Sequence, residues 1–316
     1  MGDTSLSRRG FIKQAALAGS GLAVGLVGMR SAGITRPLAG KFTHDLGFQL
    51  YTLRTIPQSD QVHAFQALAK AGFRKVEVLR QGLDQLGPML KSSGLAPVSG
   101  HFDAPLVTGN WDVWNKVEGY AAPPKGYDWK AAVEQATKLG LKYMVVPFLT
   151  PAERGNADSY RRLAERLNQA GEVCKSARIR LCYHHHSFEF QFIDGKRPLD
   201  LLMERSDRDL VGLELDVFWA SVAGADPVEI LSRFSGRVPL IHLKDKGKGT
   251  ANEFNERNVP RGAFKEVGNG VLDTPAILRA AAKTGVEEYI VEQDHCPGDP
   301  VASLIQSYRY LRKVVI

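Results

Sequence analysis

Residues 210–218 read LVGLELDVF, and residues 238–245 read VPLIHLKD. Each is a short apolar run that ends in charged or imidazole side chains, as expected of a buried strand that stops at a polar edge. The segment between them, DPVEILSRFSG (226–236), opens with Asp-Pro, which is a frequent helix start. The stretch therefore predicts a strand, a helix and a second strand.

The same alternation runs along the chain from residue 46 onward. Six further strand-like runs are LGFQLYTL (46–53), KVEVL (75–79), APVSGHF (96–102), KYMVVPFL (142–149), IRLCYHH (179–185) and EYIVEQD (288–294). Helix-like segments lie between them, for example at 59–72, 158–177 and 274–285. Eight strands alternating with helices predict an α/β fold, a single-domain (β/α)8 TIM barrel over residues 44–316. A doubly wound sheet is the alternative, but no GxGxxG loop follows any strand.

Two of the predicted connections are long, at 103–127 and 246–268, and both are rich in Gly, Pro and Asn. Long loops at the ends of barrel strands usually build or cover an active site.

The N-terminus carries a separate signal. Residues 7–13 read SRRGFIK, a twin-arginine pattern, and the weakly hydrophobic stretch QAALAGSGLAVGLVG (14–28) follows. This predicts a cleavable twin-arginine signal peptide over residues 1–35, a periplasmic or exported protein, and no membrane anchor after cleavage. An ordinary amphipathic N-terminal helix is the alternative.

Composition narrows the class of protein. The chain has 316 residues, of which 44% are hydrophobic and 24% charged, as in soluble globular proteins. The net charge of +7 is dispersed without a basic block, so nucleic acid is not an expected partner. Three cysteines, without CxxC spacing, argue against a disulfide framework.

Polar side chains gather at the predicted strand ends, which form the active-site face of a TIM barrel. Mixed His, Asp and Glu ligands suit one divalent ion such as Mn, Co, Mg or Zn. The candidates along the chain are Gln49, Tyr51, Glu77, His101, His184, His185, His186, Glu189, Glu214, Asp216, His242, Lys244, Asp245, Glu292 and Asp294.

Some residues of this set could instead have a purely structural role. His242 could be a core histidine, Glu77 could bridge neighbouring strands, and Lys244 could form an ion pair at the rim. Asp216 is different, because an unpaired carboxylate in an apolar run is costly, which favours a ligand or a buried pair. Glu214 points to the same side two residues earlier and is expected to support the ligands from deeper in the barrel.

The motifs LGFQLYTLR, YHHHSFEF, VGLELDVFWASVAGADPVEIL, VPLIHLKDK and EVGNGVLD resemble the sugar phosphate isomerase/epimerase family, which shares the xylose isomerase-like TIM barrel. Ketose 3-epimerases and inosose dehydratases are among its members. The resemblance implies one divalent metal ion with ligands from strands five to eight. It assigns Asp216 to strand six, His242 to strand seven and Glu292 to strand eight.

Strand five departs from the epimerase pattern, which has a glutamate where this chain has His184. Either His184 replaces that carboxylate as a ligand, or the strand bends and Glu189 reaches the metal. Strand alternation places His184 and His186 on one side and His185 on the other, so the three cannot all be ligands. The YHHH sequence is more similar to the dehydratase branch.

The resemblance also implies a reaction on a carbonyl-bearing carbohydrate. A base removes the proton next to the carbonyl, and the metal stabilises an enediolate. Glu189 or Glu292 is the expected base, and His186 or His101 the expected acid. Residues Gln49, Tyr51, Arg54, Glu77 and Lys244 are expected to bind the substrate.

An isomerase or epimerase is the first expectation for the activity. A dehydratase or lyase acting on an oxidised sugar is the alternative, as is a sugar-binding barrel without catalysis. A metal-dependent endonuclease on the same barrel fits poorly, since it needs more metal ligands and a basic stripe. Self-association into a homo-oligomer stays open.

Overall fold

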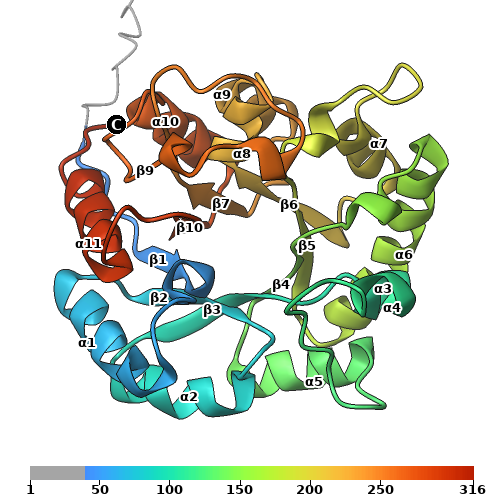
Figure 1. The fold of residues 1–316 in the computed structure, drawn as a ribbon, viewed down its shortest axis with the longest axis horizontal. Helices are drawn as coiled ribbons and strands as arrows, with labels where there is room; N and C mark the ends of the chain where they lie inside the picture. Colours follow the sequence, from blue (N-terminus) through green and yellow to red (C-terminus); the bar gives the residue numbers. More distant parts are fainter. Residues whose placement is uncertain (1–39) are drawn as a thin grey trace, which may run out of the picture. The chain divides into compact units, whose positions relative to one another are not determined.

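A computed structural model describes residues 40–316, so the predicted signal peptide lies outside the described residues. Eight parallel strands close into a barrel in the order β1-β10-β7-β6-β5-β4-β3-β2 (Figure 1). The predicted TIM barrel is thereby confirmed. The strands are β1 (Leu46–Gln49), β2 (Lys75–Leu79), β3 (Ala96–His101), β4 (Tyr143–Val146), β5 (Arg180–His184), β6 (Val211–Asp216), β7 (Leu240–Leu243) and β10 (Glu288–Val291).

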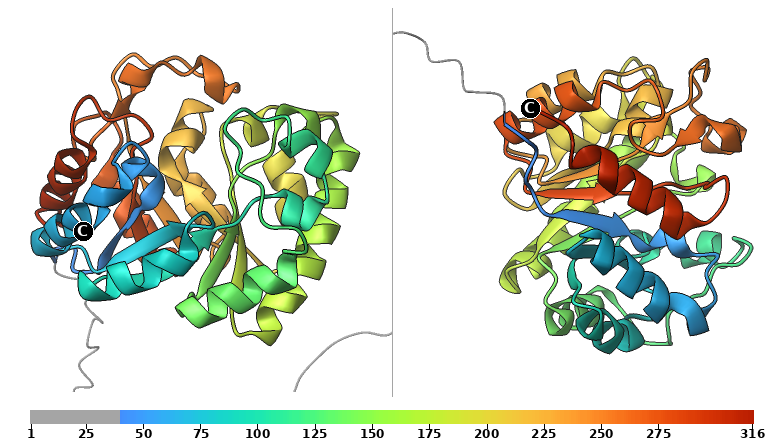
Figure 2. Two further views of the ribbon diagram at one scale, coloured as in Figure 1. Left: turned by 60° about the horizontal axis from the view of Figure 1, so that its bottom comes forward. Right: turned by 90° about the vertical axis from the view of Figure 1, so that its left-hand side faces the viewer.

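Helices surround the barrel and cover its outer face (Figures 1 and 2). The α1 and α11 helices, from opposite ends of the described chain, pack against each other and complete this outer layer. The longer helices are α1 (Gln61–Ala71), α2 (Leu83–Ser92), α5 (Trp129–Leu139), α6 (Ala157–Ser176), α7 (Pro198–Arg205), α9 (Pro227–Arg233), α10 (Thr274–Thr284) and α11 (Pro300–Leu311). Among residues 40–316, no helix has the length and apolar character that a bilayer span requires.

Strand alternation separates the interior of the barrel from the layer under the helices. A small buried cluster of strand residues includes Cys182, Leu240 and Ile290. Because successive side chains point to opposite faces, the residue two positions further along each strand also points inward. These residues are His184, His242 and Glu292. The apolar interior of the barrel thus continues directly into its polar mouth.

Most strands end earlier than the sequence predicts, and after two of them a short helix begins at once. The strand predicted at 46–53 stops at Gln49, where a 3-10 helix begins, and the strand predicted at 210–218 stops at Asp216, where α8 (Val217–Val222) begins. In both cases the polar side chain caps the new helix. Gln49 Oε1 accepts a hydrogen bond from the Tyr51 amide at 3.1 Å, and Asp216 Oδ1 accepts one from the Trp219 amide at 2.9 Å. Each cap satisfies an amide that lacks a partner within its helix.

The two long loops carry short elements of their own. Residues 103–127 include α3 (Pro105–Thr108) and α4 (Trp111–Trp114). The loop after β7 starts as β8 (Asp245–Lys246) and returns as β9 (Phe264–Lys265), which pair antiparallel.

Asp245 holds the end of the second loop. Its buried carboxylate accepts hydrogen bonds from the amides of Lys246, Gly268, Gly270 and Leu272, at 2.8–3.1 Å. A Cβ on Gly270 would lie only 2.1 Å from the carboxylate, so the chain can wrap this closely only with glycine there.

We expect Asp245→Ala to lower the free energy of unfolding by about 2–4 kcal/mol, because it leaves several amides of the loop without an acceptor. Urea denaturation followed by circular dichroism measures this change. Asp209→Ala is the matched control, since Asp209 is exposed, and should change stability by less than about 0.5 kcal/mol. Equal stability of the two variants would contradict this role of Asp245.

Candidate metal centre

The polar strand ends meet inside the mouth of the barrel, where they form two connected layers of side chains. The lower layer contains Glu77, His101, His184 and Glu214, and the upper layer contains Asp216, Lys244, Glu292 and Asp294. His242 contacts both layers. Most of these side chains are buried, so their charges must be balanced within the site.

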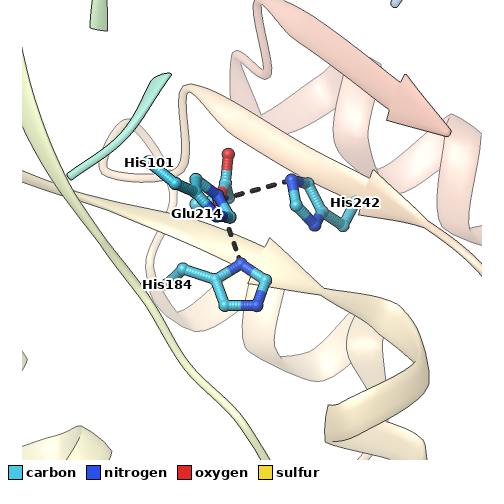
Figure 3. Close-up of side chains that lie close together, drawn as sticks. All are labelled: His101, His184, Glu214 and His242. Carbon is cyan, nitrogen blue, oxygen red and sulfur yellow. Dashed lines mark hydrogen bonds and ion pairs between the residues drawn. The ribbon is translucent and has the colours of Figure 1, made fainter. Parts of the chain in front are cut away.

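Glu214 is the centre of the lower layer (Figure 3). Its Oε2 lies 2.9 Å from His184 Nδ1, 3.0 Å from His101 Nε2 and 3.3 Å from His242 Nε2. Burial and the nearby Glu77 would raise the pKa of Glu214, but the surrounding histidines lower it to about 2. Glu214 is therefore ionised and orients three imidazoles.

Glu77 is the second carboxylate of this layer. Its Oε2 lies 2.6 Å from His242 Nε2 and 3.1 Å from His101 Nε2, and it also accepts a hydrogen bond from Gln49 Nε2 at 2.6 Å. Burial alone would raise the pKa of Glu77, but His101 and His242 lower it well below its ordinary value. Burial would likewise lower the pKa of His101, but Glu77 and Glu214 raise it to about 9. His101 is thus a cation held between two carboxylates.

The upper layer presents donor atoms that have no hydrogen-bond partner. Asp216 Oδ2 and His242 Nδ1 are both buried and make no hydrogen bond, although Oδ2 forms an ion pair with Lys244 Nζ, and the two atoms lie 3.8 Å apart. His242 Nδ1 lies 2.8 Å from Glu292 Oε2 without the geometry of a hydrogen bond. Two lone pairs do not face each other at this distance unless a proton or a metal ion lies between them. The ligand atoms of Asp216, His242 and Glu292 all lie within 4.8 Å of one another, close enough to hold one ion.

His184 directs its second nitrogen toward the same place. While Nδ1 contacts Glu214, Nε2 lies 3.9 Å from Asp216 Oδ2. A metal-binding histidine usually donates its other N–H to a carboxylate, which fixes the tautomer and the ring orientation. His184 on Glu214 and His242 on Glu77 both have this arrangement. Two imidazole nitrogens and two carboxylates are a donor set that fits Zn, Mn or Co.

Lys244 supplies the positive charge of the upper layer. Its Nζ lies 2.6 Å from Asp294, 2.7 Å from Glu292 and 3.0 Å from Asp216. Burial would raise the pKa of Glu292, but Lys244 and His242 lower it. For Asp216, burial has the larger effect and raises the pKa to about 6 despite Lys244. One ammonium group thus faces three carboxylates.

The structure places Glu189 apart from the other predicted ligands. Its Oε1 accepts a hydrogen bond from the Tyr183 hydroxyl at 2.7 Å, and its Oε2 accepts one from the His186 amide at 2.8 Å. Burial raises the pKa of Glu189 to about 7. Its carboxylate holds the turn after β5, and it belongs to neither group of potential ligands within residues 40–316.

The other two histidines of the triplet have distinct environments. His185 accepts a hydrogen bond from the Asp216 amide at Nε2, 3.1 Å away, while its Nδ1 lies 3.0 Å from the His186 carbonyl oxygen. It therefore fixes the backbone at Asp216. The His186 ring lies among the aromatic rings of Phe148, Phe188 and Trp219 at 5.1–5.7 Å, and its Nδ1 is buried without a partner.

The residues predicted to bind substrate divide between interior and rim. Gln49 and Glu77 are buried and hydrogen-bonded to each other, whereas Tyr51 is 40% exposed and the Arg54 guanidinium lies 4.1 Å above its ring. The sequence assigned Asp294 no specific role among the strand-end candidates, although its spacing of two residues from Glu292 places both on one side of the chain. The contacts of Glu214 with three histidines agree with the expectation that it supports the ligands from deeper in the barrel.

Comparison with known proteins agrees with this architecture. Residues 65–314 match the family described as xylose isomerase-like TIM barrel. Inosose dehydratases from Clostridium perfringens and Lacticaseibacillus casei are 29% and 28% identical over 167 and 163 residues, which are 50% and 49% of this chain and 56% and 54% of theirs. The chain thus spans about half the length of the curated relatives it matches.

Solved structures with the same fold cover more of the chain. A sugar phosphate isomerase/epimerase from Parabacteroides distasonis is 25% identical with a TM-score of 0.69, covering 89% of this chain and 97% of that one. The IOLI protein, solved with a bound zinc atom, is 16% identical with a TM-score of 0.62, covering 85% and 96%. The probable 3-DHS dehydratase AsbF from Bacillus anthracis is 13% identical with a TM-score of 0.62, covering 85% and 98%. The last two show the fold alone.

The family match spans most of the chain and coincides with the barrel whose mouth holds these donors, so the predicted resemblance is confirmed: the chain belongs to the xylose isomerase-like TIM barrel family, whose named relatives here are sugar phosphate isomerases/epimerases and inosose dehydratases.

Proposed function

We propose that the protein is a divalent-metal-dependent enzyme that removes a proton next to the carbonyl of an oxidised sugar and then eliminates a hydroxyl or alkoxyl group. The observation that carries this proposal is the set of His184, Asp216, His242 and Glu292, whose donor atoms are directed to one place, with no hydrogen bond at Asp216 Oδ2 or His242 Nδ1. The curated relatives named inosose dehydratase support elimination as the outcome.

A divalent ion held by these four residues would supply Lewis-acid chemistry by polarising the carbonyl of the substrate. Glu77 and Glu214 keep His242 and His184 in the orientation that presents a free nitrogen to it.

Glu292 is the carboxylate best placed to take the proton from carbon. It is ionised, it is 5% exposed at the mouth, and its Oε2 lies 2.7 Å from Lys244 Nζ. Lys244 carries protons that a departing hydroxyl can accept, and the proton gained by Glu292 can then return to Lys244 across this short contact. His101 contacts Glu77 and Glu214 and is therefore not assigned a proton transfer. It supports both steps by holding these two carboxylates in place.

The aromatic rings around His186 would exclude water from one side of the site. Phe148, Phe188 and Trp219 enclose this imidazole. Exclusion of water strengthens the electrostatic interactions of the neighbouring carboxylates and lysine.

Isomerisation or epimerisation is the second candidate, favoured by the sugar phosphate isomerase/epimerase from Parabacteroides distasonis. Epimerisation requires an acid/base group on each face of the substrate. The carboxylate that could provide the second group, Glu189, is hydrogen-bonded to Tyr183 and to the His186 amide. Elimination needs one base and one acid, which Glu292 and Lys244 provide.

We expect His184→Ala to bind Zn or Mn at least about tenfold more weakly than the natural protein, and Glu214→Gln to weaken binding by about 10–100-fold through loss of orientation. Competition with a chromogenic chelator measures the affinity. Glu189→Gln is the matched comparison and should retain its metal. Loss of metal from Glu189→Gln with full retention by His184→Ala would assign the strand-five ligand to Glu189 instead.

We expect the metal-loaded protein, incubated with an inosose in deuterated water, to incorporate deuterium next to the carbonyl and to release a dehydrated product. Proton NMR follows both. Glu292→Gln should slow the exchange by about 10²–10⁴-fold, the usual contribution of a general base.

Glu134→Gln, at an exposed position of α5, is the control and should exchange at the natural rate. Exchange that ends in a stereoisomer without elimination would favour the epimerase. A complete lack of exchange across ketoses and inososes would favour a sugar-binding barrel without catalysis.

A further inference from the structure

A cavity opens beside the upper layer of the site. It has a volume of about 430 Å³, within the range of small-molecule sites, and lies among the loops that follow β1, β7 and β10. Asp294 connects this cavity with the upper layer, because it lines the cavity while its Oδ2 contacts Lys244 Nζ at 2.6 Å. A substrate bound at Glu292 and Lys244 can therefore extend into this cavity.

The lining of the cavity is cationic. Arg54, Arg261 and Lys265 contribute positive side chains, and Asp294 is the one carboxylate among the described lining residues. That carboxylate is already paired with Lys244. The three cations therefore lack a compensating negative charge within the cavity, which gives it a positive potential.

The two arginines differ in how they are held. Arg54 is fixed, because it donates hydrogen bonds to the carbonyl oxygens of Tyr51 and Asp294 and stacks on the Tyr51 ring. Arg261 is exposed and makes no ion pair with any residue from 40 to 316. Its guanidinium is thus available to a ligand, and a guanidinium matches the geometry of a carboxylate through two parallel hydrogen bonds.

His295 and Phe264 complete the wall. Their rings lie 5.2 Å apart in an edge-to-face arrangement, and Phe264 also stacks on Phe218 at 4.3 Å. This packing gives the cavity an apolar floor beneath its cationic rim. A sugar ring, with an apolar face and polar edges, suits such a surface.

We propose that this cavity is a subsite for a carboxylate carried by the substrate, bound by Arg54 and Arg261, so that the natural substrate is an acidic sugar and not a neutral one. The inference rests on the proposed function for the reacting end of the substrate. It adds the chemical class of the distal end.

The test uses three sugars that differ only at carbon six: glucose, glucuronate and glucose 6-phosphate. Ligand-observed NMR titration with the metal-loaded protein measures their dissociation constants. We expect glucuronate to bind about tenfold or more tightly than glucose, as a charge-assisted contact provides. Arg261→Gln should remove most of that difference and leave glucose binding unchanged. Arg279→Gln, exposed on α10, is the control and should alter neither.

Equal binding of glucose and glucuronate, or no glucuronate binding at millimolar concentration, would overturn the proposal. Tighter binding of glucose 6-phosphate than of glucuronate would replace the carboxylate with a phosphate and so overturn the assigned class. Weakening of all three sugars by Arg261→Gln would show a structural effect in place of charge recognition.

These outcomes are independent of the deuterium experiment. Glucuronate preference without any proton exchange would keep the subsite and reject the proposed reaction. Proton exchange on a neutral inosose without glucuronate preference would do the reverse.

Discussion

Burial of several carboxylates at one end of a closed barrel is the constraint on which the site depends. Parallel strands all end at the same face, so Glu77, Glu214, Asp216 and Glu292 converge in a space with little solvent. An isolated buried carboxylate is very costly, and such groups persist only when they are paired. Lys244 supplies one compensating charge for three carboxylates within the described residues of the upper layer, and the imidazoles offset only part of the remainder. A divalent ion among the same donors would relieve this imbalance, which is a physical reason to expect one.

The two layers of the site have different roles: the lower layer orients the histidines, and the upper layer presents the donor atoms. Glu77 and Glu214 contact imidazole nitrogens that face downward, and this fixes the nitrogens that face upward. The imidazole nitrogens of the upper layer are therefore oriented by two carboxylates, Glu77 and Glu214, that would not touch a substrate. Part of the proposed carboxylate subsite lies in a different part of the molecule, the loop between β8 and α10. Asp245 holds that loop through backbone amides, and Arg261 is carried on it. The reacting residues can thus stay fixed at the ends of the strands, while the sequence of the loop varies with the substrate.

Much of this arrangement could be predicted from the sequence, because it follows from periodicity. Eight apolar runs alternating with helices specified the barrel, and a period of two placed His184 and His186 opposite to His185. The strand ends could not be predicted, since a capping side chain such as Asp216 belongs equally well to a strand. Its Oδ1 caps α8, while its Oδ2 faces the site without a hydrogen bond and contacts Lys244. Local sequence does not reveal that one carboxylate does both.

The position of Glu189 could not be predicted from the sequence either, because it depends on a hydrogen bond between two side chains of one motif. The motif YHHHSFEF places a carboxylate six residues after Tyr183, and the turn between them brings the two side chains together at 2.7 Å. A residue engaged in this way stabilises the turn that orients the histidines. The wall of the site on β5 is then imidazole, while the wall after β10 is carboxylate. The base and the acid proposed for elimination, Glu292 and Lys244, lie together on the opposite wall. This favours elimination over epimerisation, which requires an acid/base group on each face of the substrate.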